Sequence, residues 1–421
     1  MMRNRILGIA GLMIRQAVRS RFVFCLFVLM LSLLVGFALT IKGDGTVAGR
    51  LQVLLSYARG AVGVVLGIAS LWLACGAFSV EIENRRLHLV MVKPVRNVEL
   101  WIGKWLGIVT VAALMLTVAG LFLMGAGTVA LRRTAPDGVD GRTVRQQILV
   151  ARQRVEAVRA MGEAGEARWE LDCPDAVASG ASVSTLQYRF VSPLRDQPPI
   201  QVHWAAVDAN GASLFEADCE AYMDGVNRLD IPAESLPPGE RIALVFGMRV
   251  NQPDTPHHVT FHPEYPVELY VPTGGFGENL LRTLLLMFCR VALLAALGVT
   301  VGTVFTFPVA VFASVAMIMA TLVTQFFVFS SACEPGCGHE HHGEETTPQW
   351  VEWTGEHLAR GVQCVVAPVL HYRVRGRLAG GVAVTWDEVH EAAGVLVFMY
   401  GGALCALGCG ALRRREIALP V

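Results

Sequence analysis

The chain has 421 residues, of which 53% are hydrophobic and 17% are charged, and its formal net charge at pH 7 is zero. A soluble domain carries roughly a quarter charged residues, so this composition excludes an ordinary soluble protein and predicts segments surrounded by membrane lipid. A zero net charge also gives no reason to expect a nucleic-acid partner, and the informative signal is where the charges fall.

Uncharged apolar segments predict six spans, and therefore an α-helical polytopic membrane protein. A helix needs roughly 20 residues to cross about 30 Å of hydrocarbon. Three of these spans lie within residues 22–131, two within residues 283–332 and one at residues 392–412. Pro308 interrupts the long uncharged run that contains the fourth and fifth spans. The predicted spans are residues 22–41, 60–80 and 105–131, two helices between 284 and 333 joined by a turn at 303–308, and residues 392–412.

Arginine and lysine gather in three places beside these spans: residues 1–21, the connection between the second and third spans, and residues 413–421. Positive flanks stay preferentially in the cytoplasm, so both termini are predicted to be cytoplasmic. Residues 132–282 and 333–391 are then predicted to lie outside. A bacterial inner membrane fits this pattern best.

Residues 1–21 are predicted to form an amphipathic helix at the inner membrane surface. Apolar residues from Ile6 to Val18 recur at helical spacing, with arginines on the other side. Two other interpretations stay open. The segment is an N-terminal extension of the first span, or it is a signal peptide, although no small-residue cleavage site precedes Arg15.

Residues 132–282 are long enough for an extracytoplasmic domain. Apolar residues at helical spacing predict an amphipathic helix over residues 142–161. Short alternating runs such as "IQVHWAAV" and "RIALVFGMRV" then predict strands of a small β-sandwich. Because an oxidising compartment permits disulfides, we predict one between Cys173 and Cys219, although sequence alone does not determine connectivity.

The chain carries none of three common motifs of ATP-binding and hydrolytic enzymes. It has no G-x-x-x-x-G-K-[ST] phosphate-binding loop, no H-E-x-x-H and no G-x-S-x-G. We therefore predict no catalytic residues and no directly bound cofactor other than a metal ion at one loop. That loop, "CEPGCGHEHHGEE", offers thiol and imidazole ligands for zinc or copper at Cys333, Cys337, His339, His341 and His342.

Other interpretations of the histidine-rich loop stay open. Its spacing matches no known zinc finger, and a short histidine-rich tract is a compositional signal only. Arg290 is the other unusual residue, because an arginine within a span is costly and needs a partner or a path to the interface. It either extends towards the outer interface near Arg282 or faces a subunit interface or substrate path.

One segment resembles a known family. Residues 81–107, "EIENRRLHLVMVKPVRNVELWIGKWLG", resemble the signature region of the type-2 ABC exporter permeases. In that region one span ends in an acidic E-x-E pair, and a run with Pro and Arg leads to Gly-Lys at the next span. The matching residues are Glu81, Glu83, Leu87, Pro94, Arg96, Glu99, Gly103 and Lys104.

The resemblance implies a membrane-spanning permease subunit of an ABC transporter. Residues 81–92 would be the coupling helix that docks on a separate ABC ATPase subunit, which binds the ATP, and residues 1–21 would be the elbow helix. A second copy or a related permease would complete the transporter. The coupling residues implied are Glu81, Glu83, Arg85, Arg86, Leu87, Pro94 and Arg96.

Rival interpretations stay open beside this one. The connection between spans two and three is otherwise an ordinary solvated loop. The large outer domain also fits a transmembrane sensor or mechanotransmission subunit that transports nothing, and the histidine-rich loop alone would suggest a membrane metalloenzyme. The substrate and its direction of travel do not follow from the sequence.

Overall fold

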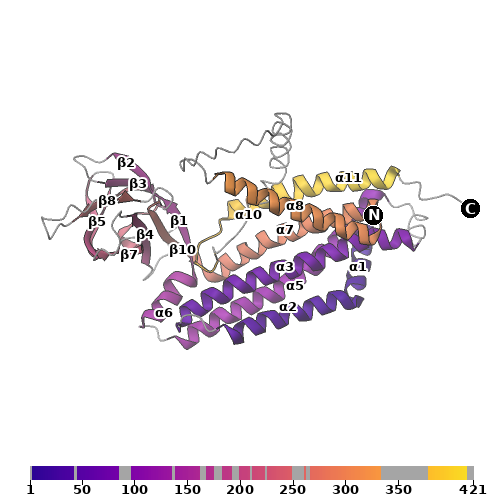
Figure 1. Cartoon of the computed structure of the whole chain (residues 1–421), viewed down its shortest axis with the longest axis horizontal. Helices are drawn as coiled ribbons and strands as arrows, with labels where there is room; N and C mark the ends of the chain where they lie inside the picture. The colour runs from indigo at the N-terminus through magenta and orange to yellow at the C-terminus, as the bar shows by residue number, and fades with distance from the viewer. Residues whose placement is uncertain are drawn as a thin grey trace, which may run out of the picture.

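The structure is a computed structural model, and it describes residues 2–41, 45–84, 96–134, 138–161, 167–174, 183–191, 199–208, 211–222, 225–248, 260–261, 266–332 and 378–414. A helical bundle occupies one part of the molecule and a β domain the other (Figure 1). The helix α1 and the end of α11 lie at the far end of the bundle from the β domain (Figure 1).

Within the described residues, five helices are long and apolar enough to cross a membrane, which indicates an integral membrane protein. One further predicted span corresponds to α8 (Phe307–Ala332), which is not among these five helices, although its stretch Phe307–Ala320 is a shorter apolar helix. The count of six therefore stays a prediction. The five helices are α2 (Arg21–Thr40), α3 (Val47–Glu83), α5 (Asn97–Arg133), α7 (Phe276–Val304) and the final helix Trp386–Arg414.

The bundle helices differ from the predicted spans mainly in length. The helix α3 has 37 residues, about 56 Å at 1.5 Å per residue, so it extends beyond the hydrocarbon. It begins at Val47 rather than at residue 60, because Thr46 accepts a hydrogen bond from the Gly49 amide and caps it. The predicted span begins at residue 60 because Arg50 and Arg59 are unsuited to lipid, but arginines do not stop a helix. The turn predicted at 303–308 is confirmed, since α7 ends at Val304 and α8 begins at Phe307.

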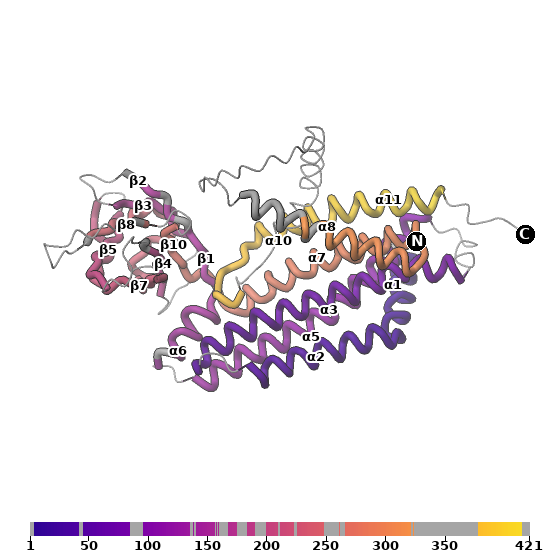
Figure 2. Tube along the Cα trace, viewed as in Figure 1, coloured from indigo at the N-terminus to yellow at the C-terminus, as the bar shows by residue number. Residues whose placement is uncertain are grey.

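The final helix contains a π-helical stretch. It comprises α10 (Trp386–Ala392), the π-helical residues Ala393–Tyr400, and α11 (Gly401–Arg414). Figure 2 shows α2, α3, α5 and α7 running side by side, with α1 (Met2–Arg19) turned across one end of them. Helix α1 buries Ala10, Met13 and Ala17 and leaves Leu12 and Val18 exposed, so only part of its predicted apolar face packs against protein.

The β domain consists of two antiparallel sheets that share one core. The first sheet has the order β1 (Val150–Glu156), β10 (Glu268–Gly275), β4 (Val183–Val191), β7 (Val226–Pro232), with β9 (Thr260–Phe261) also paired to β4. The second has the order β2 (Val158–Met161), β3 (Ala167–Asp172), β8 (Arg241–Met248), β5 (Ile200–Asp208), β6 (Ser213–Ala221).

Aromatic side chains join the two sheets. Tyr188 on β4 and Trp204 on β5 are both almost fully buried, and their ring centroids lie 4.9 Å apart. Trp169 on β3 packs edge-on against Phe261 on β9 at 4.5 Å. Residues from each sheet therefore interdigitate in one apolar core, as a sandwich requires, and the predicted mainly-β domain is confirmed.

The helix predicted over residues 142–161 is wrong. Helix α6 (Val139–Thr143) and a π-helical turn at Val144–Ile148 are short, and the chain then forms β1 and β2. Helical spacing does hold for Val144 and Ile148, which are both buried. Beyond them, β1 pairs antiparallel with β10 from residue 150 to residue 156, and this tertiary pairing outweighs the local pattern.

The predicted disulfide between Cys173 and Cys219 is also wrong, because both residues are free thiols. Cys173 directly follows β3, and Cys219 lies on β6, with β8 and β5 between them. Strands are about 4.8 Å apart, so three steps separate the two thiols by much more than a disulfide spans. The Cys219 thiol instead lies 3.4 Å from the Tyr188 hydroxyl.

Candidate functional site

The acidic residue Glu81 and the lysine of the Gly-Lys pair meet at the end of the bundle that carries α1. Glu81 stands in the last turn of α3, and its carboxylate lies 2.5 Å from the Lys104 ammonium on α5. Lys104 also donates to the Ala77 carbonyl and lies 4.5 Å above the Phe78 ring. Only 3% of the Lys104 side chain is exposed, against 24% for Glu81. The pair therefore joins two long helices through a largely desolvated charge contact.

The second acidic residue of the motif joins a third helix. The Glu83 carboxylate accepts a hydrogen bond of 3.0 Å from the Phe307 amide, the first residue of α8. A carboxylate at this position accepts a hydrogen bond from one of the free amides at the start of a helix, and the positive end of the helix dipole stabilises its charge. Asn84 ends α3 and donates to the Val80 carbonyl at 2.8 Å. Glu81 and Glu83 thus connect α3 to α5 and to α8.

The other motif residues start α5 and make room for α1. The Glu99 side chain, which is buried, accepts a hydrogen bond from the Arg96 amide at 3.2 Å and so caps α5. Gly103 faces α1, where a Cβ atom would lie 2.8 Å from the Cβ of Ile9. Glycine is needed here because any side chain would push α1 away. We call the residues Glu81, Glu83, Arg96, Glu99, Gly103 and Lys104 the motif cluster.

Several predicted site residues lie outside the described part of the chain. Among the coupling residues these are Arg85, Arg86, Leu87 and Pro94, and so is most of the predicted coupling helix 81–92. The same holds for every predicted metal ligand: Cys333, Cys337, His339, His341 and His342. Within the described residues, no group of three or more His, Cys, Asp and Glu side chains is placed to hold a metal ion.

Arg290 lies within α7, half-buried between the buried residues Cys289 and Val291. It stands two helical turns beyond Arg282, about 12 Å along the axis. Both predicted roles for Arg290, extension to the interface or a place in a path, stay predictions.

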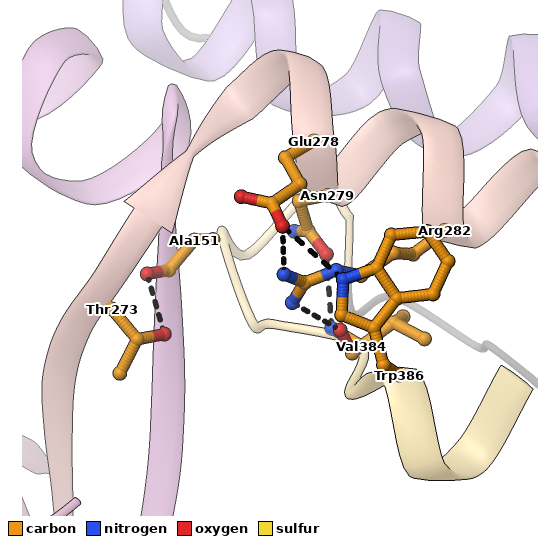
Figure 3. A network of polar contacts seen from close by, with 7 residues as sticks. All are labelled: Ala151, Thr273, Glu278, Asn279, Arg282, Val384 and Trp386. Atoms are coloured by element: carbon orange, nitrogen blue, oxygen red, sulfur yellow. Dashed lines mark hydrogen bonds and ion pairs between the residues drawn. The ribbon is translucent and has the colours of Figure 1, made fainter. Parts of the chain in front are cut away.

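A second polar site lies at the opposite end of the bundle, where α7 begins directly after β10 (Figure 3). Asn279 is fully buried in the first turns of α7. Its amide donates to the Val382 carbonyl at 3.0 Å and accepts from the Val384 amide at 2.9 Å. Arg282 donates to the Val384 carbonyl at 2.9 Å and forms an ion pair with Glu278.

Trp386 completes this junction network. Its indole nitrogen donates to Glu278 at 3.3 Å, and the Arg282 guanidinium lies 5.2 Å from its ring centroid (Figure 3). Such a cation over an aromatic face is attracted by the ring quadrupole. Because Trp386 begins the final helix, the network holds the start of α7 to the start of that helix.

The segment before Trp386 also binds the β domain. Arg152 on β1 donates its amide to the Gly381 carbonyl at 2.7 Å, and its carbonyl accepts from the Ala383 amide at 2.7 Å. Gly381 has φ +69°, and a Cβ there would lie 2.0 Å from the Gln147 carbonyl oxygen, so no other residue fits without displacement. A third link runs from Asp140 on α6, whose carboxylate accepts the first two amides of α3 at 2.8 and 2.9 Å.

The sequence indicated the motif cluster but not the junction. Glu278 and Arg282 stand four residues apart near the start of an apolar run, a helical ion-pair spacing that is readable from sequence. Asn279, Arg152 and Asp140 carry no such local signal, because their partners lie about a hundred residues away or more. Only the fold brings them together.

Comparison of the chain with protein-family models and with curated protein sequences gives no match.

Proposed function

We propose that this protein is the permease subunit of an ABC transporter, which moves a substrate across the membrane with energy from a separate ATP-binding subunit. The observation that carries the proposal is the motif cluster. Its residues Glu81, Glu83 and Lys104 resemble the exporter signature, and they connect three helices at one end of the bundle.

The physical argument concerns how a force would pass through the motif cluster. Residues 85–95 stand between the end of α3 and the start of α5 in the chain. A displacement of this segment acts on α3 and α5, which the Glu81–Lys104 pair holds together, and on α8 through Glu83. An ATPase bound here would therefore move several helices as one body, as a rigid-body transition requires.

The rest of the mechanism follows the same scheme. Two permease subunits, identical or related, form the translocation path, and an ATPase dimer binds at the end of the bundle that carries α1. The charge pattern predicts that end to be cytoplasmic. This chain contributes no bond-breaking residues, and the β domain guides or releases substrate or contacts an extracytoplasmic partner.

The experiment tests coupling at Glu83. The tagged full chain is purified with its ATPase from its native membrane, and ATP hydrolysis is measured for wild type, Glu83→Lys and Glu83→Gln. Glutamine keeps an acceptor for the Phe307 amide, whereas lysine removes it and reverses the charge. We expect Glu83→Lys to lose permease-dependent hydrolysis and Glu83→Gln to keep much of it.

The matched control is Glu234→Lys, an exposed residue in the β domain. It makes the same charge change far from the motif cluster and should leave hydrolysis unchanged. Absence of any ATPase in the purified complex, or wild-type coupling in Glu83→Lys, would reject the proposal. Orientation is tested separately with Asn84→Cys, which should react with a membrane-impermeant maleimide only after the membrane is opened.

A second function, mechanotransmission without transport, is supported by the junction network. Strand β10 continues into α7 without a linker, and Asn279 and Arg282 fasten the first turns of α7 to the segment that binds β1. Movement of helices would therefore reach the β domain. Export into sealed vesicles by the purified complex separates the two functions, because a transmitter hydrolyses ATP without moving substrate.

A further inference from the structure

A cavity of about 460 Å³ lies where the β domain meets the helices. Its wall comes from the first turn of α3, from α6 and the turn after it, from β1, β4, β7 and β10, and from the segment before Trp386. Small-molecule pockets have volumes of roughly 300 to 1,000 Å³ and occur preferentially between domains. Size and position are therefore those of a ligand site.

Two guanidinium groups line this cavity. Arg152 comes from β1 and has 8% of its surface exposed, whereas Arg228 comes from β7 and is exposed. Arg152 contacts neutral oxygens, the Thr185 hydroxyl at 3.5 Å and the Gly380 carbonyl at 2.8 Å. Neither arginine forms an ion pair with any residue in the part of the chain that the structure describes.

The environment of Arg152 is unfavourable to its charge. Burial lowers the pKa of Arg152, the positive charge of Arg228 lowers it further, and Tyr270 and Asp230 act in the opposite direction. Asp230 reaches Arg152 only through Thr185, whose hydroxyl donates to it at 3.1 Å. An anion beside both guanidinium groups would offset their repulsion and the loss of hydration.

Asp140 is the acidic side chain that lines the cavity, and it does not neutralise the two arginines. Both oxygens of Asp140 accept backbone amides of α3, from Val47 and Ala48. The other polar side chains in the wall include the amides of Gln147 and Gln187, which can donate as well as accept. The cavity thus offers more donors than a carboxylate has acceptor sites, and a phosphate group, with more oxygens, matches it better.

We propose that this cavity binds a phosphate group, carried by a small polar molecule or by a lipid headgroup, between Arg152 and Arg228. Arginine recognises phosphate through two parallel charge-assisted hydrogen bonds. The lipid source is reasonable because α3, about 56 Å long, is longer than the hydrocarbon core of about 30 Å, so the helix extends into the headgroup region or beyond it. Since both the domain and the helices supply the wall, a bound phosphate would hold one against the other.

The experiment uses the purified full chain and has two arms. The first measures binding of glycerol phosphate to delipidated protein in detergent by calorimetry. The second measures phosphatidylglycerol retained after nanodisc reconstitution and mild extraction, by native mass spectrometry. Arg228→Gln is the test variant, because Arg228 is exposed and its loss leaves the core intact. Arg159→Gln is the control, an exposed arginine on β2 in the other sheet.

We expect Arg228→Gln to weaken phosphate binding about ten- to a hundredfold, Arg228→Lys to weaken it less, and Arg159→Gln to leave it unchanged. Dependence on Arg228 in the first arm identifies a free phosphate compound as the ligand. Dependence in the second arm alone identifies a lipid headgroup. Absence of binding in both arms, or binding that Arg228→Gln leaves unaltered, overturns the proposal. Neither arm involves ATP or transport, so the outcome is separate from that of the proposed function.

Discussion

Removal of one partner from the Glu81–Lys104 pair should strongly destabilise the packing of α3 against α5 at this end of the bundle. Breaking a buried ion pair costs about 3 to 5 kcal/mol, because the remaining charge stays buried without compensation. Lys104 fits this case, with 3% of its side chain exposed. Glu81 is 24% exposed, so water replaces part of the lost carboxylate. We therefore expect Glu81→Gln to cost about 3 kcal/mol, the lower end of that range.

The neutral double variant should recover most of this loss. Glu81→Gln with Lys104→Met removes both charges and keeps the length of the lysine side chain. Replacing a buried ion pair by apolar groups of similar size is often neutral. The double variant should therefore lie within about 1 kcal/mol of wild type and be about 2 to 3 kcal/mol more stable than Glu81→Gln.

Cys75 provides the assay for this opening. It lies on α3 close to Glu81 in sequence and has no exposed surface. Its alkylation requires the helices to separate, so the rate follows the opening equilibrium. A loss of 3 kcal/mol corresponds to about a 150-fold faster rate. A rate within threefold of wild type for Glu81→Gln, or a double variant as fast as the single one, would refute the reasoning.

Three further predictions concern packing, the junction and a buried thiol. Gly103→Ala should destabilise the bundle by about 1 to 3 kcal/mol, because the added methyl group overpacks against α1. Gly36→Ala has open space around its Cβ and should stabilise the bundle by about 0.5 to 1 kcal/mol. Denaturation midpoints in detergent measure both effects. Asn279→Leu should cost about 2 to 4 kcal/mol, because two hydrogen bonds are lost, the Val384 amide stays buried and the Val382 carbonyl stays partly buried. Hydrogen exchange at residues 382–386 should rise. Burial raises the pKa of the Cys173 thiol to about 11, so its alkylation in the folded protein should stay slow from pH 7 to pH 10, as followed by mass spectrometry.

The sign of the Cys173 effect follows from the direction of its shift. The unfolded thiol has its ordinary pKa of 9.0 and the folded one about 11, so the neutral form is favoured by folding. The resulting stability is complete below pH 9 and is lost as the pH rises towards 11. Fast alkylation of native Cys173 at pH 8 would contradict the burial argument. Equal stability of the two alanine variants, or unchanged exchange in Asn279→Leu, would contradict the packing arguments.

The sequence by itself determined the class of the protein. Long uncharged runs can be accommodated only in lipid or a large core, so composition alone led to apolar helices, and five of them are confirmed. Alternating runs such as residues 200–207 likewise determined strands, because period two places one face in a core. The motif residues were also readable, since Glu81 and Lys104 stand beside the ends of apolar runs.

Tertiary structure decided what those residues contact. The segment 142–161 has a helical pattern, yet residues 150–156 pair with β10, whose residues lie more than a hundred positions later in the chain. Cys173 and Cys219 lie in one sheet but on strands that two others separate. Asn279, Arg152 and Asp140 gain their roles only where the domain meets the helices. Hydrogen bonds and burial depend on distance in space, and a local sequence pattern carries no information about partners that far along the chain.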